Sequence, residues 1–223
     1  MSGKLKGILA VACLVSAVLA CRVATGGGGD HTPTSASNVI LSDDFSSENW
    51  GTGTDNDSSV EYANNALQVI IFKTNYFVWS TPNDQDYQNV HIEVTVTSND
   101  TDSTTAFGVM CDQQAANGNF YYLGMTPAGE YAIAKSVEGQ SDLFLTNNDQ
   151  WASSDQIAKN ASSYRVGADC GGETLTLYVD DQQIASVSDS TYTSGAVGVF
   201  TWSGEEANTT NVSFDDFLMM GSP

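Results

Sequence analysis

Positive charge is the property that this 223-residue chain has least of, with 7 Lys and Arg against 27 Asp and Glu. Proteins bind nucleic acid by neutralising its phosphates with basic side chains, so this composition excludes DNA and RNA as partners. The same shortage argues against adsorption of a folded domain to anionic lipid headgroups. Apolar residues are 41% of the chain and aromatic residues 10%, enough for a hydrophobic core. The length predicts one domain, or two small ones.

Familiar catalytic motifs are absent as well. The sequence contains no Gly-x-Ser-x-Gly turn, no His-Glu-x-x-His zinc motif, no phosphate-binding loop and no dinucleotide fingerprint. An EF-hand loop is also missing. The motifs therefore give no indication of an enzyme.

The apolar run over residues 7–20 is too short to cross a bilayer, which takes roughly 20 residues. It follows Lys4 and Lys6, and a short basic segment before an apolar run of this length is typical of a secretory signal peptide. Residues 1–20 are therefore predicted to be an export signal.

The end of this run, Val18-Leu19-Ala20-Cys21, resembles the lipobox of bacterial lipoproteins. The resemblance implies that Cys21 becomes the acylated first residue of the mature protein, since several acyl chains together anchor a protein stably. Lys4 and Lys6 leave with the signal, so 5 basic and 27 acidic residues remain, a net charge of −22. Arg22 is compatible with an outer-membrane or cell-surface location. An ordinary signal peptide with a chance cysteine is the alternative.

Residues 21–38 predict a flexible tether. They contain four consecutive glycines, Gly26 to Gly29, followed by Ser, Thr and Pro without apolar periodicity. No second linker follows, so residues 39–220 predict a single domain.

Alternating apolar and polar residues predict an all-β domain. Residues 90–96 and 175–179 alternate strictly, as half-buried strands do, and residues 180–183 predict a hairpin turn into a strand over 184–187. Further strands are expected over residues 66–72, 76–80, 106–112, 120–126, 130–136, 142–145, 164–169, 195–202 and 211–219, whereas residues 154–159 are the one helical candidate. Ten or more short strands without a long helix are typical of a two-sheet antiparallel sandwich.

The order of several motifs resembles a known superfamily. The domain opens with Ser42-Asp43-Asp44-Phe45, continues with Phe107-Gly108-Val109-Met110-Cys111 and Asn119-Phe120-Tyr121-Tyr122, and closes with Val212-Ser213-Phe214-Asp215-Asp216-Phe217. Over roughly residues 39–220 this series is similar to the concanavalin-A-like lectin/glucanase superfamily, in particular the branch with 3-keto-disaccharide hydrolase and laminin-G-like domains of bacterial lipoproteins. The resemblance implies a jelly roll whose concave face holds carbohydrate in many relatives.

Cys111 and Cys170 are the two cysteines left for the domain. Each continues the inward-facing positions of its predicted strand, and two inward-facing cysteines in an exported protein predict a disulfide. Such a bond is worth typically about 2–4 kcal/mol. Two buried free thiols, which behave as small apolar groups, are the alternative.

Carboxylate patterns argue against glycoside hydrolysis. Laminarinase-type members of the superfamily carry a Glu-x-Asp-x-(x)-Glu strand that places the catalytic carboxylates on one face, and no such motif occurs here. Glu93 is the one acidic residue on its predicted strand and is expected to face outward into solvent. The alternative is that it pairs with His91. No catalytic residue is assigned.

Acidic residues at the two ends of the domain are candidates for a structural calcium site. The resemblance implies that the first and last strands lie together and often share a calcium ion, for which Asp43, Asp44 and Asp215 would be ligands. Carboxylate oxygens suit calcium. Two acidic turns in an acid-rich chain are the alternative.

Aromatic side chains are the main candidates for ligand binding, because flat rings pack on the apolar faces of sugars while Asp, Asn or Gln bind the hydroxyls. If Phe120 faces inward, strand alternation turns Tyr121 outward, whereas the face of Trp202 stays open. The candidate contacts are Tyr121, Trp202, Trp79 and Tyr131, with Trp151 and Tyr178 as further rings and Asp112, Gln113 and Asn119 as polar partners. Core or rim packing is the alternative for each ring.

The sequence thus predicts a non-catalytic, lipid-anchored surface domain that recognises a glycan or another cell-envelope component and meets the membrane through its anchor only. The alternatives are a glycoside-active enzyme on the same fold and a purely structural envelope lipoprotein. A binding domain should show at least two coplanar exposed rings on the concave sheet, and an enzyme two carboxylates about 5–10 Å apart in a groove.

Overall fold

A computed structural model describes residues 38–99, 103–205 and 209–222 of the chain. The predicted signal peptide, Cys21 and all but the last residue of the predicted tether lie outside these residues. Within them every regular element is a strand, so no helix of the described part is long and apolar enough to span a membrane. Residues 154–159, the helical candidate, form turns instead.

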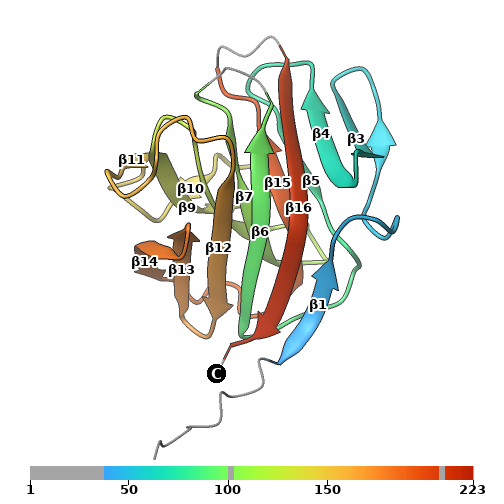
Figure 1. Cartoon of the computed structure of the whole chain (residues 1–223). Helices are drawn as coiled ribbons and strands as arrows, with labels where there is room; N and C mark the ends of the chain where they lie inside the picture. Colours follow the sequence, from blue (N-terminus) through green and yellow to red (C-terminus); the bar gives the residue numbers. More distant parts are fainter. Residues whose placement is uncertain (1–37, 100–102, 206–208, 223) are drawn as a thin grey trace, which may run out of the picture. The chain divides into compact units, whose positions relative to one another are not determined.

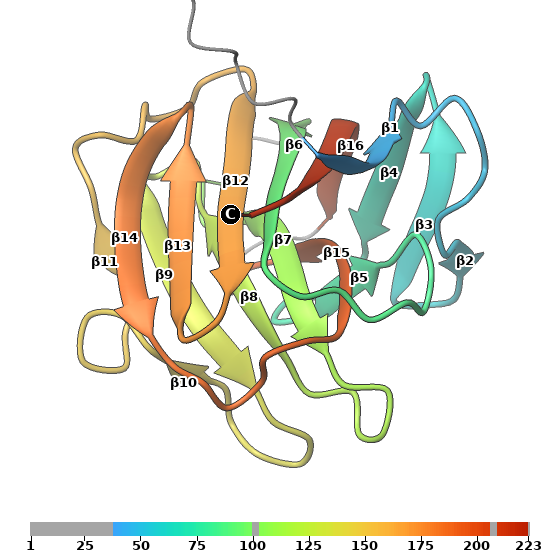
Figure 2. The same ribbon diagram turned by 90° about the horizontal axis from the view of Figure 1, so that it is seen from below.

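Sixteen strands form two antiparallel sheets, which Figures 1 and 2 show as two layers. The nine-stranded sheet has the order β14-β13-β12-β6-β16-β4-β3-β2, with β1 beside β16, and the seven-stranded sheet the order β10-β9-β8-β7-β15-β5, with β11 beside β9. This arrangement confirms the predicted two-sheet jelly roll. The bounds are β1 Val39–Asp43, β2 Gly53–Thr54, β3 Ser58–Ala63, β4 Ala66–Ile71, β5 Phe77–Ser80, β6 Val90–Ser98, β7 Ala106–Gln113, β8 Phe120–Met125, β9 Glu130–Ser136, β10 Leu143–Phe144, β11 Ala152–Ser153, β12 Tyr164–Gly171, β13 Thr174–Val179, β14 Gln182–Ser188, β15 Ala196–Trp202 and β16 Thr210–Gly221.

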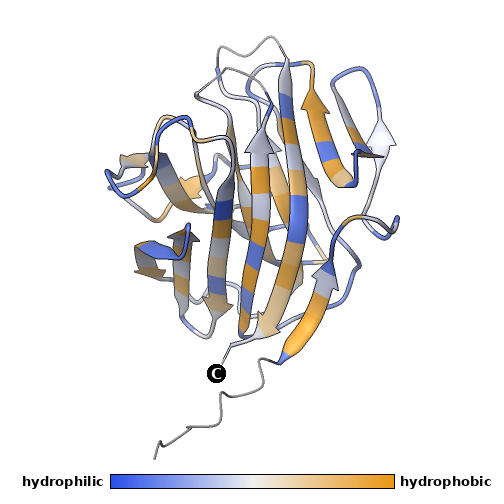
Figure 3. Ribbon diagram, in the orientation of Figure 1, coloured by the Kyte–Doolittle hydropathy of each residue, from blue (hydrophilic) through white to orange (hydrophobic). Residues whose placement is uncertain are grey.

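The core lies between the two sheets and follows the alternation of the strands. On β6, Val90, Ile92, Val94 and Val96 are buried, whereas the residues between them are partly exposed on the outer face. Figure 3 shows this alternation as bands of hydrophobic and hydrophilic colour along β6 and β16. Each aliphatic side chain buried in this way stabilises the fold by about 1.5–3 kcal/mol.

The β13–β14 hairpin is tighter than the sequence predicts. Its turn is Asp180 and Asp181 alone, both with positive φ (49° and 63°), and Val179 pairs with Gln182. Two central residues with positive φ are typical of a type I′ turn, which suits the right-handed twist of a hairpin.

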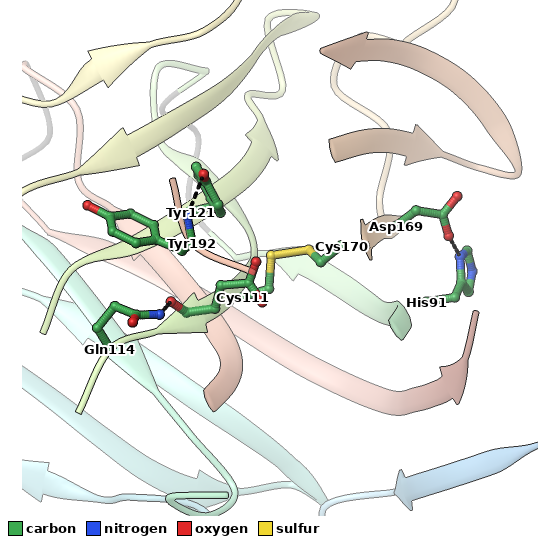
Figure 4. Close-up of a disulfide and its surroundings, with 8 residues drawn as sticks. His91, Cys111, Gln114, Tyr121, Asp169, Cys170 and Tyr192 are labelled. Carbon is green, nitrogen blue, oxygen red and sulfur yellow. Dashed lines mark hydrogen bonds and ion pairs between the residues drawn. A yellow bond between two sulfur atoms is a disulfide. The ribbon is translucent and has the colours of Figure 1, made fainter. Parts of the chain in front are cut away.

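The disulfide prediction is confirmed. Cys111 of β7 and Cys170 of β12 are bonded, with Cα atoms 6.5 Å apart, and both are buried. Because β7 and β12 belong to different sheets, the bond cross-links the two layers of the sandwich (Figure 4).

Candidate functional site

The outer face of the seven-stranded sheet carries a cluster of aromatic side chains. Phe120 and Tyr122 of β8 and Phe200 of β15 pack there around Met110, and Phe77 of β5 covers them. The rings of Phe77 and Phe200 are stacked, with centroids 4.9 Å apart and planes within 8°. This side of the sheet is therefore apolar, like the side that faces the core.

A pair of glycines allows close packing beneath these rings. Gly108 and Gly124 face each other on β7 and β8, and a Cβ atom on Gly124 would lie 2.5 Å from Cζ of Phe200. The backbone can thus approach the Phe200 ring closely because no side chain intervenes.

A groove of about 380 Å³ opens beside this cluster. We call it the aromatic groove; it is lined by Asn75, Phe77, Tyr122, Ser141, Asp142, Phe144, Trp151, Phe200 and Trp202. The indole rings of Trp151 and Trp202 are nearly parallel, with an angle of 22° between their planes and 6.5 Å between their centroids. Both rings are partly exposed, so they offer flat apolar surface to a ligand.

One carboxylate lines the aromatic groove. The Tyr122 hydroxyl donates a hydrogen bond of 3.0 Å to Oδ2 of Asp142, and burial, together with the charge of Asp142, raises the pKa of Tyr122, so the hydroxyl stays protonated. Oδ1 of Asp142 has no hydrogen-bond partner among the described residues and is available as an acceptor. The groove thus combines ring surface with a positioned acceptor, as sugar sites require.

Of the rings predicted from sequence, Trp202 and Trp151 line the aromatic groove, and Trp79 lies outside it. Trp79 is on the same face of the sheet, where its ring contacts Phe77 and Phe120, and is 47% exposed. Tyr178 lies on the outer face of the other sheet and donates a hydrogen bond to Asp169. The sequence alternation did not decide which face of the sheet carries the Trp202 side chain, and the structure places it on the outer face.

The prediction that Tyr121 faces outward is wrong. Its side chain is buried in the main core, and its hydroxyl donates to Asp189 and accepts from the backbone N–H of Tyr192. Phe120 and Tyr122 are the outward residues. Strand β8 is buried on both faces, so alternation cannot tell them apart.

The other predicted contacts do not reach the groove. Tyr131 packs against the main core, and Asn119 uses its side-chain oxygen to accept a hydrogen bond from the backbone of Glu138. Gln113 and Asp112 lie at an irregularity where β7 meets β15. Asp112 is 5% exposed, and burial raises its pKa to about 6.

A polar network occupies the outer face of the nine-stranded sheet, opposite the core, and Figure 4 shows its His91–Asp169 contact. His91 contacts Asp169 through Nδ1 (2.6 Å) and Glu93 through Nε2 (2.9 Å), and Arg165 donates to Glu93 from Nε and Nη2. The hydrogen bond to Asp169 raises the pKa of His91. Burial alone would raise the pKa of Glu93, but its bonds from His91 and Arg165 lower it. Glu93 faces outward as predicted but is paired rather than freely solvated.

The proposed calcium ligands stay a prediction. The first and last strands do lie together, with Asp43 opposite Phe217. Asp43 accepts hydrogen bonds from the backbone of Phe45 and from Nε1 of Trp50, and Asp215 accepts one from the backbone of Asp216. In the described part of the chain no group of three or more His, Cys, Asp or Glu side chains has an arrangement that could hold a metal ion. A calcium site including Asp44 would therefore need backbone carbonyls or water as further ligands.

No family model matches the chain, and no curated protein matches it by sequence. Solved structures match its fold. The carbohydrate-binding module CBM66 from Bacillus subtilis is 16% identical, with a TM-score of 0.59 over 77% of this chain and 95% of that module. A β-glucanase from Bacillus licheniformis is 10% identical, with a TM-score of 0.58 over 84% of this chain and all of that one.

The catalytic domain of a laminarinase from Thermotoga petrophila is also 10% identical, with a TM-score of 0.55 over 83% of this chain and 98% of that domain. At these identities the likeness concerns the fold. The described body of this chain is a jelly-roll sandwich of the kind found in carbohydrate-binding modules and glucanases.

Proposed function

We propose that this protein is a lipid-anchored, non-catalytic surface domain that binds an uncharged glycan in the aromatic groove. The observation that carries the proposal is the nearly parallel pair Trp151 and Trp202 in a groove that Asp142 also lines. Rings of this kind pack on the apolar face of a sugar, while the carboxylate accepts a hydrogen bond from a hydroxyl. The carbohydrate-binding module of the same fold supports the proposal.

Charge favours an uncharged ligand. The described part of the chain has four basic residues, and none of them lines the aromatic groove. Three of the four are paired with carboxylates, as Lys73–Asp57, Lys135–Asp189 and Arg165–Glu93. A glycan with carboxylate or sulfate groups would meet Asp142 and a strongly acidic protein, without a cation to compensate.

The acidic groups of the groove favour binding over hydrolysis. Glycoside hydrolysis uses two carboxyl groups on either side of the scissile bond. Among the residues lining the groove Asp142 is the one acid, and it is hydrogen-bonded to Tyr122. Asp112 has a raised pKa, as catalytic acids often have, but it is not one of the lining residues.

Trp202→Ala tests glycan binding. We expect the purified protein to bind neutral glycans on an array. The variant should lose tenfold or more in affinity, about 1.4 kcal/mol or more, because it lacks one of the two indole rings on which the sugar would pack. Titration calorimetry with the glycan giving the strongest array signal measures the loss. Phe72→Ala is the control, because Phe72 is an exposed aromatic side chain (47%) that does not line the groove. Equal affinity of Trp202→Ala and the natural protein, or an array without signal, would contradict the proposal.

Lipid anchoring rests on the lipobox-like residues before Cys21. We propose that the chain belongs to the lipoprotein branch that its motifs resemble and resides in the outer membrane or at the surface of a bacterial cell. In a bacterial host the natural chain should incorporate labelled palmitate and partition into detergent, and Cys21→Ser should do neither, because the acylated thiol is absent. If the chain has an ordinary signal peptide, the two forms will behave alike.

A further inference from the structure

A second hollow lies next to the aromatic groove. It has a volume of about 550 Å³ and is lined by Trp79, Ser80 and Thr81, by the segment from Gly51 to Asp55, and by Ser58 and Val60 of β3. We call it the Trp79 hollow. Trp79 is among the most exposed large apolar side chains of the described residues, and hydroxyl-bearing residues surround it.

The segment from Gly51 to Asp55 is held in place by hydrogen bonds. The N–H of Gly51 donates to the carbonyl of Thr81 (3.1 Å), and the Ser80 hydroxyl donates to the carbonyl of Gly51 (2.7 Å). Further along, Gly53 and Thr54 pair with β3, and Oδ1 of Asp55 accepts hydrogen bonds from the backbone of Asp57 and Ser58. The hollow is thus preformed, which reduces the entropy lost on binding.

The pairing of β5 with β15 connects the aromatic side chains of the Trp79 hollow with those of the aromatic groove. Trp79 pairs with Phe200 and Phe77 pairs with Trp202, so Trp79 and Trp202 are diagonal neighbours on one face, with Cα atoms about 7–8 Å apart. The Phe77 ring lines the groove and lies 6.3 Å from the Trp79 ring. Aromatic surface therefore continues from Trp151 through Trp202 and Phe77 to Trp79.

We propose that the Trp79 hollow is a second sugar subsite, so that the protein binds a chain of several neutral sugar units across Phe77 rather than one terminal sugar. The inference rests on the proposed glycan binding and adds the length of the ligand to it. Trp79 supplies the stacking surface. The hydroxyls of Thr52 and Thr81 and Oδ2 of Asp55 supply hydrogen-bonding groups, and no basic residue lines the hollow.

A length series tests the proposal. Cello-, laminari-, xylo- and inulo-oligosaccharides of one to six units are titrated into the natural protein by calorimetry. We expect affinity to rise by about tenfold between the disaccharide and the tetrasaccharide in the series that binds, and then to level off. Trp79→Ala should abolish this rise and leave disaccharide affinity unchanged, whereas Trp79→Phe should restore part of it. Phe72→Ala should change neither.

The outcomes separate the two proposals. Equal affinity for the disaccharide and the hexasaccharide in the natural protein overturns the subsite but leaves glycan binding intact. So does a Trp79→Ala variant that loses affinity equally at every length, because Trp79 would then act through the aromatic groove. If no oligosaccharide of any length binds the natural protein, both proposals fail.

Discussion

Replacing both Cys111 and Cys170 with alanine will lower the free energy of unfolding by about 4 kcal/mol. The two cysteines are 59 residues apart, and a cross-link closing a loop of roughly 60 residues removes about that much chain entropy from the unfolded state. Alanine is preferred to serine because both positions are buried, and a buried hydroxyl without a partner would add its own cost. Chemical denaturation followed by tryptophan fluorescence measures the difference.

Reduction supplies the control for the disulfide. All samples carry serine at positions 13 and 21, so that Cys111 and Cys170 are the remaining thiols. A reductant should destabilise the protein with the disulfide by an amount close to the effect of the double substitution, and should leave the alanine variant unchanged. A difference below about 1 kcal/mol would show that the bond does not restrict the unfolded chain as the entropy argument requires.

Asp112→Asn will stabilise the protein by about 3 kcal/mol near pH 7.5 and by much less near pH 4. Burial raises the pKa of Asp112 from 3.8 to about 6, so the folded state holds this proton more tightly than the unfolded state does. The free energy of unfolding therefore falls as pH rises from about 4 to about 6, by roughly 1.4 kcal/mol for each pH unit. Asparagine has no proton to lose and avoids this cost.

Backbone geometry makes asparagine a close replacement. Asp112 has a φ of 53°, and asparagine tolerates this left-handed region better than most residues. Asp181→Asn is the matched control, because Asp181 also has a positive φ (63°) but is exposed. Urea denaturation of each variant at both pH values gives the comparison. A gain for Asp112→Asn that is equal at both pH values would show that removal of a charge is not its cause.

The longer strands of both sheets can be predicted from sequence, including β7 and β8, which are buried on both faces. Burial alternates along β6 and, except at Gly167 and Thr176, along β12 and β13, and the predicted positions of these strands are confirmed. The two-residue strands β2 and β11 show no pattern because they are too short for alternation. β1 and β3 were also missed.

The candidate site is harder to predict, because both faces of the seven-stranded sheet are apolar. Every residue of β8 is buried, so the assumption that Phe120 faces the core led to Tyr121 rather than Tyr122 as the outward ring. Gly124, which leaves room for Phe200, was the available signal of the outer face. The proximity of Trp151 to Trp202 depends on how residues 141–151 cross the sheet, which no local pattern encodes.

The disulfide and the terminal strand pair together form a mechanical path through the sandwich. The chain enters the described body at β1, which is held by its ladder to β16. A pull on residue 38 along the strand axis loads all the hydrogen bonds of this ladder in shear, so that they must break together. From β16 the load passes through β6 to β12, and from there the covalent Cys111–Cys170 bond carries it to β7, in the sheet of the aromatic groove. Tension between the start of the body and a ligand held in that groove is thus borne across the layers by a covalent bond.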